Sequence, residues 1–78
     1  MSELNCKAIE AIVNEYNVRA QVCEMHINHA DSYEGARIEE KLARLKGIKI
    51  AAFVAADVAG VEVEWCSEGH LLGRLRIK

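Results

Sequence analysis

The sequence predicts a single α+β domain, residues 1–78, in which two helices pack in two layers on a three-stranded antiparallel meander, in the order ααβββ. Three observations support this prediction. Apolar residues in the first third of the chain recur at alternating steps of three and four, the spacing of one side of an α-helix. A second helical stretch ends at a glycine, and the residues after it change to the continuous and alternating apolar patterns of strands. No repeat, low-complexity segment or linker divides the 78 residues.

The first helix is expected to begin at Ser2, whose hydroxyl can cap the first amides, and to run to about Ala30. This stretch contains no Gly and no Pro, and it has two separate apolar seams. The first seam consists of Ile9, Val13, Tyr16, Ala20, Cys23, Ile27 and Ala30. The second seam consists of Leu4, Ala8, Ala11, Val18, Val22 and Met25. A small domain closes its core with one seam, so the second needs a further surface: another element of the fold, a second copy or another protein.

Two charged residues, Glu15 and Arg19, lie between the seams one helical turn apart, and we expect them to form an ion pair worth about 0.2–0.5 kcal/mol. The second seam repeats every seven residues, as in helices that pair with other helices. Glu15 and His29 interrupt it at two intervening positions. A polar residue of this kind helps to set the register of a helical dimer.

A tight connection is expected around residues 29–32, where polar residues bond readily to nearby backbone. A second, shorter helix then runs from about Tyr33 to Lys46 and ends at Gly47, the residue expected in a left-handed C-cap. Its core face consists of Ile38, Leu42 and Leu45. Because the connection is short, the two helices should lie antiparallel.

The first strand of the meander is predicted from the apolar run Ile48–Val54, with a helical turn across Ala51–Ala59 as the alternative. A turn at Asp57–Gly60 precedes the second strand, Val61–Trp65. The last strand is Leu71–Lys78, and like the second it alternates apolar with charged residues, which indicates a sheet with one buried face.

A three-residue loop, Ser67-Glu68-Gly69, is expected to join the last two strands and to set their register. It places Trp65 opposite Leu71 and Val63 opposite Gly73, so that the indole crosses near the glycine and fills the gap there. Every in-pointing residue then meets an in-pointing one. The outer face of the sheet carries Glu62, Glu64, Arg74 and Arg76.

Charge is distributed unevenly, although the net charge is only -2. Up to Glu34 the chain has two basic and six acidic residues, 2 - 6 = -4, and from Gly35 onward it has eight basic and six acidic ones, 8 - 6 = +2. The acidic first helix presents a candidate contact face made of Glu3, Glu10 and Glu24. Two basic rows, one on the second helix and one on the last strand, are candidate nucleic-acid contacts, namely Arg37, Lys41, Arg44, Arg74 and Arg76.

Cysteine and histidine residues are the potential zinc ligands of this chain, and they fall into two groups. The groups are Cys23, His26 and His29 on the first helix and Cys66 with His70 on the hairpin. The predicted register points the hairpin pair away from the first helix, so one ion could not collect both groups, and we expect no metal and no cofactor. A nucleophilic Cys66–His70 pair would lack a cleft. No phosphate-binding glycine loop or acyl-transfer motif is present, so no enzymatic activity is expected.

The cellular compartment is indicated by cysteine usage. Three cysteines far apart in the sequence are an odd-numbered set, which favours a reducing, cytoplasmic environment. The longest apolar run, Ile50–Ala56, is far shorter than the roughly 18 residues of a membrane span, so no membrane association is expected.

Taken together, these features predict a small non-enzymatic protein that works by binding, as a homodimer or as an inhibitor or adaptor docked on a larger complex. The expected interface is the second seam, represented by Leu4, Ala11, Val18, Val22 and Met25. One specific version is an inhibitor encoded by a phage or mobile element, of the anti-CRISPR or anti-restriction kind, whose acidic helix would occupy the basic groove of a nucleoprotein complex. The alternative is a small nucleic-acid-binding regulator that uses the two basic rows, and the third candidate is a zinc-binding module.

Overall fold

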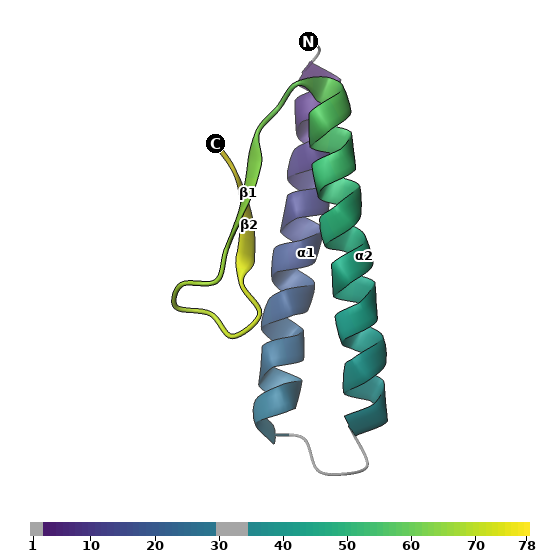
Figure 1. Ribbon diagram of the computed structural model, residues 1–78, viewed down its shortest axis with the longest axis vertical. Helices are drawn as coiled ribbons and strands as arrows, with labels where there is room; N and C mark the ends of the chain where they lie inside the picture. Colours follow the sequence, from purple (N-terminus) through teal and green to yellow (C-terminus); the bar gives the residue numbers. More distant parts are fainter. Residues whose placement is uncertain (1–2, 30–34) are drawn as a thin grey trace.

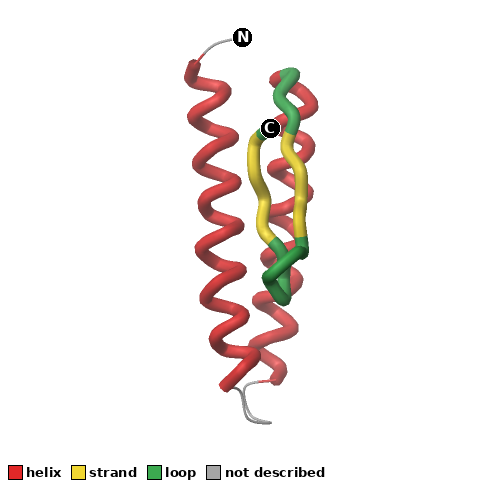
Figure 2. The backbone as a smooth tube through the Cα atoms, turned by 90° about the vertical axis from the view of Figure 1, so that its left-hand side faces the viewer, coloured by secondary structure: helices red, strands yellow, loops and turns green. Residues whose placement is uncertain are grey.

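The computed structural model describes residues 3–29 and 35–78, which form two helices and one β-hairpin (Figure 1). The elements are α1 (Glu3–His29), α2 (Gly35–Ala59), β1 (Val63–Cys66) and β2 (Arg74–Ile77). The helices run antiparallel, side by side, and the hairpin packs on one side of the pair (Figure 2). The protein is therefore an elongated α+β domain of two layers, with overall dimensions of 47 × 22 × 14 Å.

The core is built from the first seam of α1, as predicted. Its members Ile9, Val13, Tyr16, Ala20 and Cys23 are all buried, and Ile27 packs against them at the end of the helix. Leu45, Ala52 and Ala56 of α2 and Leu75 of β2 complete the core. Small side chains, namely Ala20 and Cys23 of α1 and Ala52 and Ala56 of α2, form part of the contact between the two helices.

The second helix does not end at Gly47, and the predicted strand Ile48–Val54 is wrong. Residues 48–54 belong to α2, which continues to Ala59, so the helical alternative was the correct interpretation of this run. The last part of α2, residues 48–59, contains five alanines, and alanine is the best helix former. Burial of Ala52 and Ala56 against α1 offsets the roughly 1 kcal/mol that a glycine inside a helix costs relative to alanine.

Asp57–Ala59, which the sequence assigns to a turn, are the last residues of α2, and the glycine that caps the helix is Gly60. Its φ is 74°, in the left-handed region that favours glycine. The Gly60 N–H donates to the carbonyl of Asp57 at 3.3 Å, and the Val61 N–H donates to the carbonyl of Ala56 at 2.9 Å. This pair of bonds is the Schellman motif, which directs the chain back along the helix pair toward β1.

The predicted three-stranded meander is also wrong, because the sheet in the described part of the chain has only two strands, β1 and β2. Their register differs from the predicted one: Trp65 lies opposite Leu75 and Val63 opposite Ile77. The partner of Trp65 has moved four positions, from Leu71 to Leu75. Because four is an even number, the predicted alternation is kept, and inward residues still face inward residues.

The connection between the strands runs over residues 67–73 and is longer than predicted. The expected tight turn forms within it, with a bond of 3.1 Å from the His70 N–H to the Ser67 carbonyl and a φ of 79° at Gly69. After this turn, residues 70–73 do not pair with β1, and strand pairing begins only at Cys66 and Arg74. The backbone N–H groups of Leu72 and Leu75 donate instead to side chains of α1, those of Glu24 and Asn17. Neither described helix is long and apolar enough to cross a membrane.

Candidate functional site

The second seam of α1 is exposed wherever the structure describes its side chains. Val18, Val22 and Met25 are 50%, 45% and 58% exposed, and Ala8 and Ala11 are exposed as well. Neither α2 nor the hairpin covers them. The side chain of Leu4, the remaining member of the seam, lies outside the described residues.

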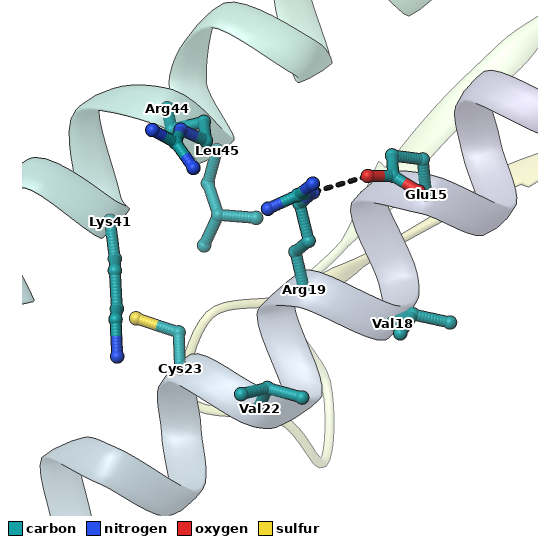
Figure 3. A pocket seen from close by; sticks show the side chains of 8 residues that line it. All are labelled: Glu15, Val18, Arg19, Val22, Cys23, Lys41, Arg44 and Leu45. Atoms are coloured by element: carbon teal, nitrogen blue, oxygen red, sulfur yellow. Dashed lines mark hydrogen bonds and ion pairs between the residues drawn. The ribbon is translucent and has the colours of Figure 1, made fainter.

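A groove between α1 and α2 adjoins the exposed seam, with the hairpin behind it on the far side of the helices (Figure 3). Its volume is about 390 Å³. It is lined by residues of the two helices, namely Glu15, Val18, Arg19, Val22, Cys23, Lys41, Arg44 and Leu45. The seam and the groove thus lie on the side of the helix pair that the hairpin leaves open.

A second hollow lies between the same helices nearer the start of α1. It has a volume of about 270 Å³ and is lined by Ala8, Ile9, Ala55, Val58 and Ala59. Val58 is 85% exposed. Since no hairpin residue lines either hollow, we treat the region as one surface, the sheet-distal face. It comprises Ala8, Ala11, Val18, Val22 and Met25 of α1 with Lys41, Arg44, Ala55 and Val58 of α2.

The groove is lined by more basic than acidic side chains. Glu15 and Arg19 form the ion pair that the sequence predicts, and both side chains are about half exposed. Lys41 and Arg44 form no ion pair within the described part of the chain. The groove therefore combines an apolar floor with three cations and one carboxylate, a net charge of 3 - 1 = +2.

The thiol of Cys23 forms part of the floor of the groove and has no features of a nucleophile. Burial raises its pKa, and the nearby charge of Lys41 offsets this only in part. A thiol with a raised pKa stays protonated at neutral pH and reacts slowly. Cys23 is thus a small core residue.

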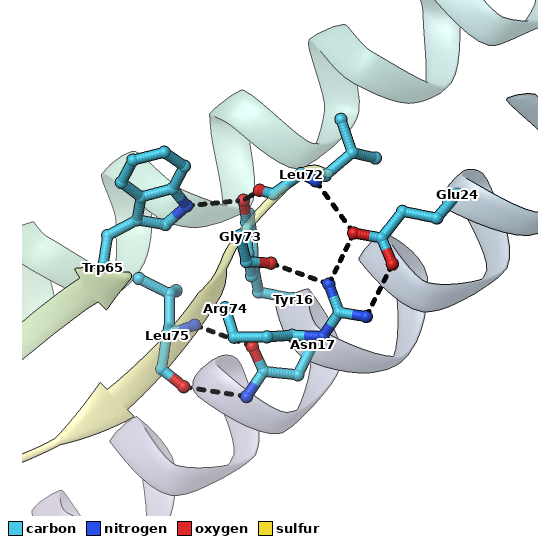
Figure 4. Close-up of polar contacts among 8 residues, drawn as sticks. All are labelled: Tyr16, Asn17, Glu24, Trp65, Leu72, Gly73, Arg74 and Leu75. Carbon is cyan, nitrogen blue, oxygen red and sulfur yellow. Dashed lines mark hydrogen bonds and ion pairs between the residues drawn. The ribbon is translucent and has the colours of Figure 1, made fainter. Parts of the chain in front are cut away.

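On the opposite side of α1, the amide of Asn17 pairs with the free edge of β2 (Figure 4). Its Nδ2 donates to the Leu75 carbonyl at 2.8 Å, and its Oδ1 accepts from the Leu75 N–H at 2.8 Å. The side-chain amide takes the place of a neighbouring strand, so both backbone groups of Leu75 are satisfied. A third strand on this edge is excluded by α1 itself.

A carboxylate of α1, that of Glu24, holds the start of β2. Its two oxygens accept from Nη1 and Nη2 of Arg74 at 2.9 and 2.7 Å, and one of them also accepts from the Leu72 N–H at 2.8 Å. The two side chains are only 14% and 20% exposed. The bonds from Arg74 and Leu72 outweigh partial burial and lower the pKa of Glu24 to about 2.

A third contact joins the hairpin to the core through Tyr16. Its hydroxyl donates to the Leu72 carbonyl at 3.0 Å and accepts from Nε1 of Trp65 at 3.1 Å. Side chains on one side of α1 therefore form hydrogen bonds with backbone groups of the hairpin, namely those of Tyr16, Asn17 and Glu24. This polar side is used within the domain, whereas the sheet-distal face is not.

The other predicted contact residues are scattered. Glu24 and Arg74, assigned by sequence to two different partners, bind each other, and Arg76 forms an ion pair with Glu64 on the outer face of the sheet. Glu10 is exposed on α1. The side chains of Glu3 and Arg37 lie outside the described residues. Four of the five basic candidates have described side chains. Among these four, Lys41 and Arg44 form no ion pair with another described residue.

The side chain of His29, one of the potential zinc ligands, lies outside the described residues. Among the described residues, no group of three or more His, Cys, Asp or Glu side chains is placed to hold a metal ion. Cys66 is paired with Arg74 across the hairpin, so the proposed juxtaposition with His70 is wrong. Cys23 is buried and Cys66 is exposed.

Sequence reasoning missed the roles of Asn17 and Glu24: it assigned Glu24 to an acidic contact face and gave Asn17 no role. The helical period assigns them correctly to a polar side of α1, but it does not reveal that the hairpin lies there. Tyr16 did carry a usable signal, because a tyrosine in a core seam needs a partner for its hydroxyl.

Comparison of the chain with protein families, with curated proteins and with solved structures found no match. The functional argument therefore depends on the geometry described above.

Proposed function

We propose that this protein is a non-enzymatic protein-binding domain and that its contact surface is the sheet-distal face. The observation that carries the proposal is the exposure of Val18, Val22 and Met25 beside a groove that has an apolar floor and charged residues around it. A partner that covers apolar side chains clustered around a hollow removes them from water. This lowers the free energy by about 25 cal/mol per Å² of apolar area buried.

The total exposed area supports the same proposal. The chain exposes 5515 Å², whereas an ordinary folded monomer of its mass, 8.7 kDa, exposes about 4,700 Å². The excess is roughly 800 Å², which is about the area that each partner loses in a standard protein–protein interface.

We propose the role of an inhibitor or adaptor of a larger complex, which needs a binding surface and no catalytic group. The phage or mobile-element version, with anti-CRISPR activity, depends on the acidic side of α1. Glu24 is neutralised there by Arg74, and Glu10 remains exposed. We accordingly place the contact on the apolar face and treat the acidic side as a secondary contact.

Nucleic-acid binding is the second candidate, favoured by the two cations at the groove, Lys41 and Arg44. The last strand contributes little to it, since Arg74 and Arg76 are held by Glu24 and Glu64. Titration of a labelled arbitrary duplex at low salt separates the two candidates. A regulator would bind with a steep salt dependence that Lys41→Glu abolishes, whereas the protein-binding proposal expects no binding. The zinc module is tested by elemental analysis of the purified protein.

The experiment that tests the proposal compares Val22→Glu with Leu71→Glu. Both changes replace an exposed apolar side chain by a carboxylate, but Leu71 lies in the hairpin connection and is 63% exposed. We expect a protein partner, whether a second copy or another chain, to associate with the wild type and with Leu71→Glu and to be lost in Val22→Glu. Chemical crosslinking and affinity capture followed by mass spectrometry identify the partner. Equal association of both variants would contradict the proposal.

A further inference from the structure

We infer that the edge of β1 that faces away from β2 binds an extended segment of another protein, which adds to the hairpin as a third strand. This open edge consists of the backbone N–H and carbonyl groups of Val63 and Trp65. The inference concerns a surface other than the sheet-distal face, so it goes beyond the proposed function. Addition of a strand to an exposed sheet edge is a recurring way in which proteins bind peptides.

The register of the hairpin determines which backbone groups of β1 point outward. The Lys78 N–H donates to the Glu62 carbonyl at 2.9 Å. These two residues directly continue the ladder beyond its end pair, in which Val63 lies opposite Ile77. Opposed residues of an antiparallel pair exchange hydrogen bonds only at every second position. The N–H and carbonyl groups of Val63 and Trp65 therefore point away from β2.

The other edge of the hairpin shows how such outward groups are satisfied. On β2 the same parity turns the N–H and carbonyl of Leu75 outward, and both bond to the side-chain amide of Asn17. In the described part of the chain, the corresponding groups of Val63 and Trp65 have no hydrogen-bond partner, and β2 is the only strand beside β1. Figure 2 shows β2 on the side of α1 and β1 on the side of α2. One edge is thus closed by α1, and the other stays open.

The open edge can accept a complete set of strand hydrogen bonds. Two residues with two outward groups each form 2 × 2 = 4 bonds with one incoming strand. Proline, lysine and bulges block strand addition at many natural sheet edges. β1 contains no proline and no lysine, and its four residues pair with β2 in one continuous register. An extended backbone is therefore the group that matches this edge.

The surroundings of the open edge indicate which side chains the bound segment has. A hollow of about 260 Å³ lies between the start of β1 and α2. It is lined by four apolar residues, among them Phe53 and Val63, and by three charged ones, and Phe53 is 37% exposed. Successive side chains of a strand point to opposite faces, so every second one faces α2 and the others lie beside Glu64 on the outer face. The bound segment therefore alternates apolar with polar residues.

A second copy of the chain fits this edge less well than another protein does. Two β1 strands related by a two-fold axis use both Val63 and Trp65 only if each pairs with the other, which sets Glu64 opposite the second copy's Glu64. Side chains of such a non-hydrogen-bonded pair lie closest together, and like charges there destabilise a sheet. Arg76 offsets the repulsion only in part, since its side chain is 74% exposed. The occupant is therefore a segment of another protein.

The variant that tests the edge is Val63→Pro. It removes an outward N–H, and proline is accepted in an edge strand where the N–H faces solvent, so the ladder with β2 is preserved. Val63→Ala is the matched control, because it shortens the same side chain and keeps the N–H. The probe is a short labelled peptide selected on the wild type from a displayed library of random peptides. We expect the peptide to bind Val63→Ala within about threefold of the wild type and Val63→Pro at least about tenfold more weakly.

Methylation of the peptide backbone gives a second test that uses only the wild-type protein. Methyl groups on the amides at alternate positions, those that face β1, should weaken binding at least about tenfold, and methyl groups at the intervening positions should not. Hydrogen exchange locates the contact: the amides of Val63 and Trp65 should exchange rapidly in the free protein and become protected in the complex. Equal binding of both methylated peptides, or unchanged exchange at these two amides, would overturn the inference.

Further outcomes separate this inference from the proposed function and from a second copy. Val22→Glu should bind the peptide as the wild type does, and loss of the peptide in Val22→Glu would move the contact to the sheet-distal face. A wild type that is dimeric by sedimentation equilibrium, and that Val63→Pro makes monomeric, would overturn the choice of another protein as the occupant. A selection in which no peptide is sensitive to Val63→Pro would overturn the inference and leave the proposed function standing.

Discussion

The indole ring of Trp65 lies directly against Gly73 in the neighbouring strand connection. A Cβ atom on Gly73 would stand 2.5 Å from Nε1 and Cε2 of the indole, closer than carbon atoms approach in folded proteins. The φ of Gly73 is 75°, which also favours glycine. The contact lets the Trp65 Nε1–H reach the Tyr16 hydroxyl, so the absence of a side chain at position 73 supports the hydrogen bond that ties the hairpin to α1.

Replacement of Gly73 should therefore destabilise the protein through two effects. We expect Gly73→Ala to lower the free energy of unfolding by about 2–4 kcal/mol, of which about 1 kcal/mol comes from the left-handed backbone and the rest from the clash with Trp65. Gly69→Ala is the matched control, because Gly69 has a φ of 79° and no atom within 4 Å of its Cβ position. Denaturant unfolding measures both. Equal losses in the two variants would show that the Trp65 contact contributes nothing.

The amide of Asn17 should contribute to stability because it satisfies the free edge of β2. We expect Asn17→Ala to cost about 1–3 kcal/mol, since the N–H and carbonyl of Leu75 both lose a partner in a partly buried site. Asn14→Ala, on the exposed side of the same helix, is the control and should change stability by less than about 0.5 kcal/mol. Hydrogen exchange at the Leu75 amide gives a local measurement. An Asn17→Ala variant that protects this amide as well as the wild type does would refute the edge-capping role.

The carboxylate of Glu24 should make stability fall in acid. Its pKa is lowered from 4.5 to about 2, so the unfolded chain takes up this proton at a higher pH than the folded one. The stabilisation is complete above about pH 5 and is lost as the pH falls through 2, with a total of up to about 3 kcal/mol. Thermal unfolding at a series of pH values should show this loss for the wild type and for Glu10→Gln, and a flatter profile for Glu24→Gln. Parallel profiles for the wild type and Glu24→Gln would exclude the ion pair as the cause.

Several features of the fold follow from local sequence patterns, and the structure confirms them. The three-four spacing of α1 identifies the buried seam, and the pair Glu15–Arg19 forms as expected. In β2 the alternation correctly predicts that Leu75 and Ile77 face inward and Arg76 outward, whereas burial does not alternate in β1 and Arg74 binds Glu24 of α1. The contact between Trp65 and Gly73 occurs although the register is different. These properties depend on residues a few positions apart or on the parity of a strand, so a change in register by an even number leaves them intact.

Other features depend on contacts between distant parts of the chain. The run Ile48–Val54 is compatible with a strand or a helix, and packing of Ala52 on α1 decides for the helix. The register of the hairpin is decided by Asn17 and Glu24, which bind the backbone of Leu75 and Leu72. A loop sequence contains no information about such distant hydrogen bonds, and for that reason the three-residue loop was a wrong prediction.

The same division applies to the candidate site. The sequence by itself determined that α1 has two apolar seams and that its charge is opposite to that of the second helix, because both follow from composition and helical period. Only the tertiary structure decided which seam stays exposed. The hairpin is held on one side of α1 by hydrogen bonds to Asn17, Glu24 and Tyr16, and this leaves Val18 and Val22 on the open side beside the groove.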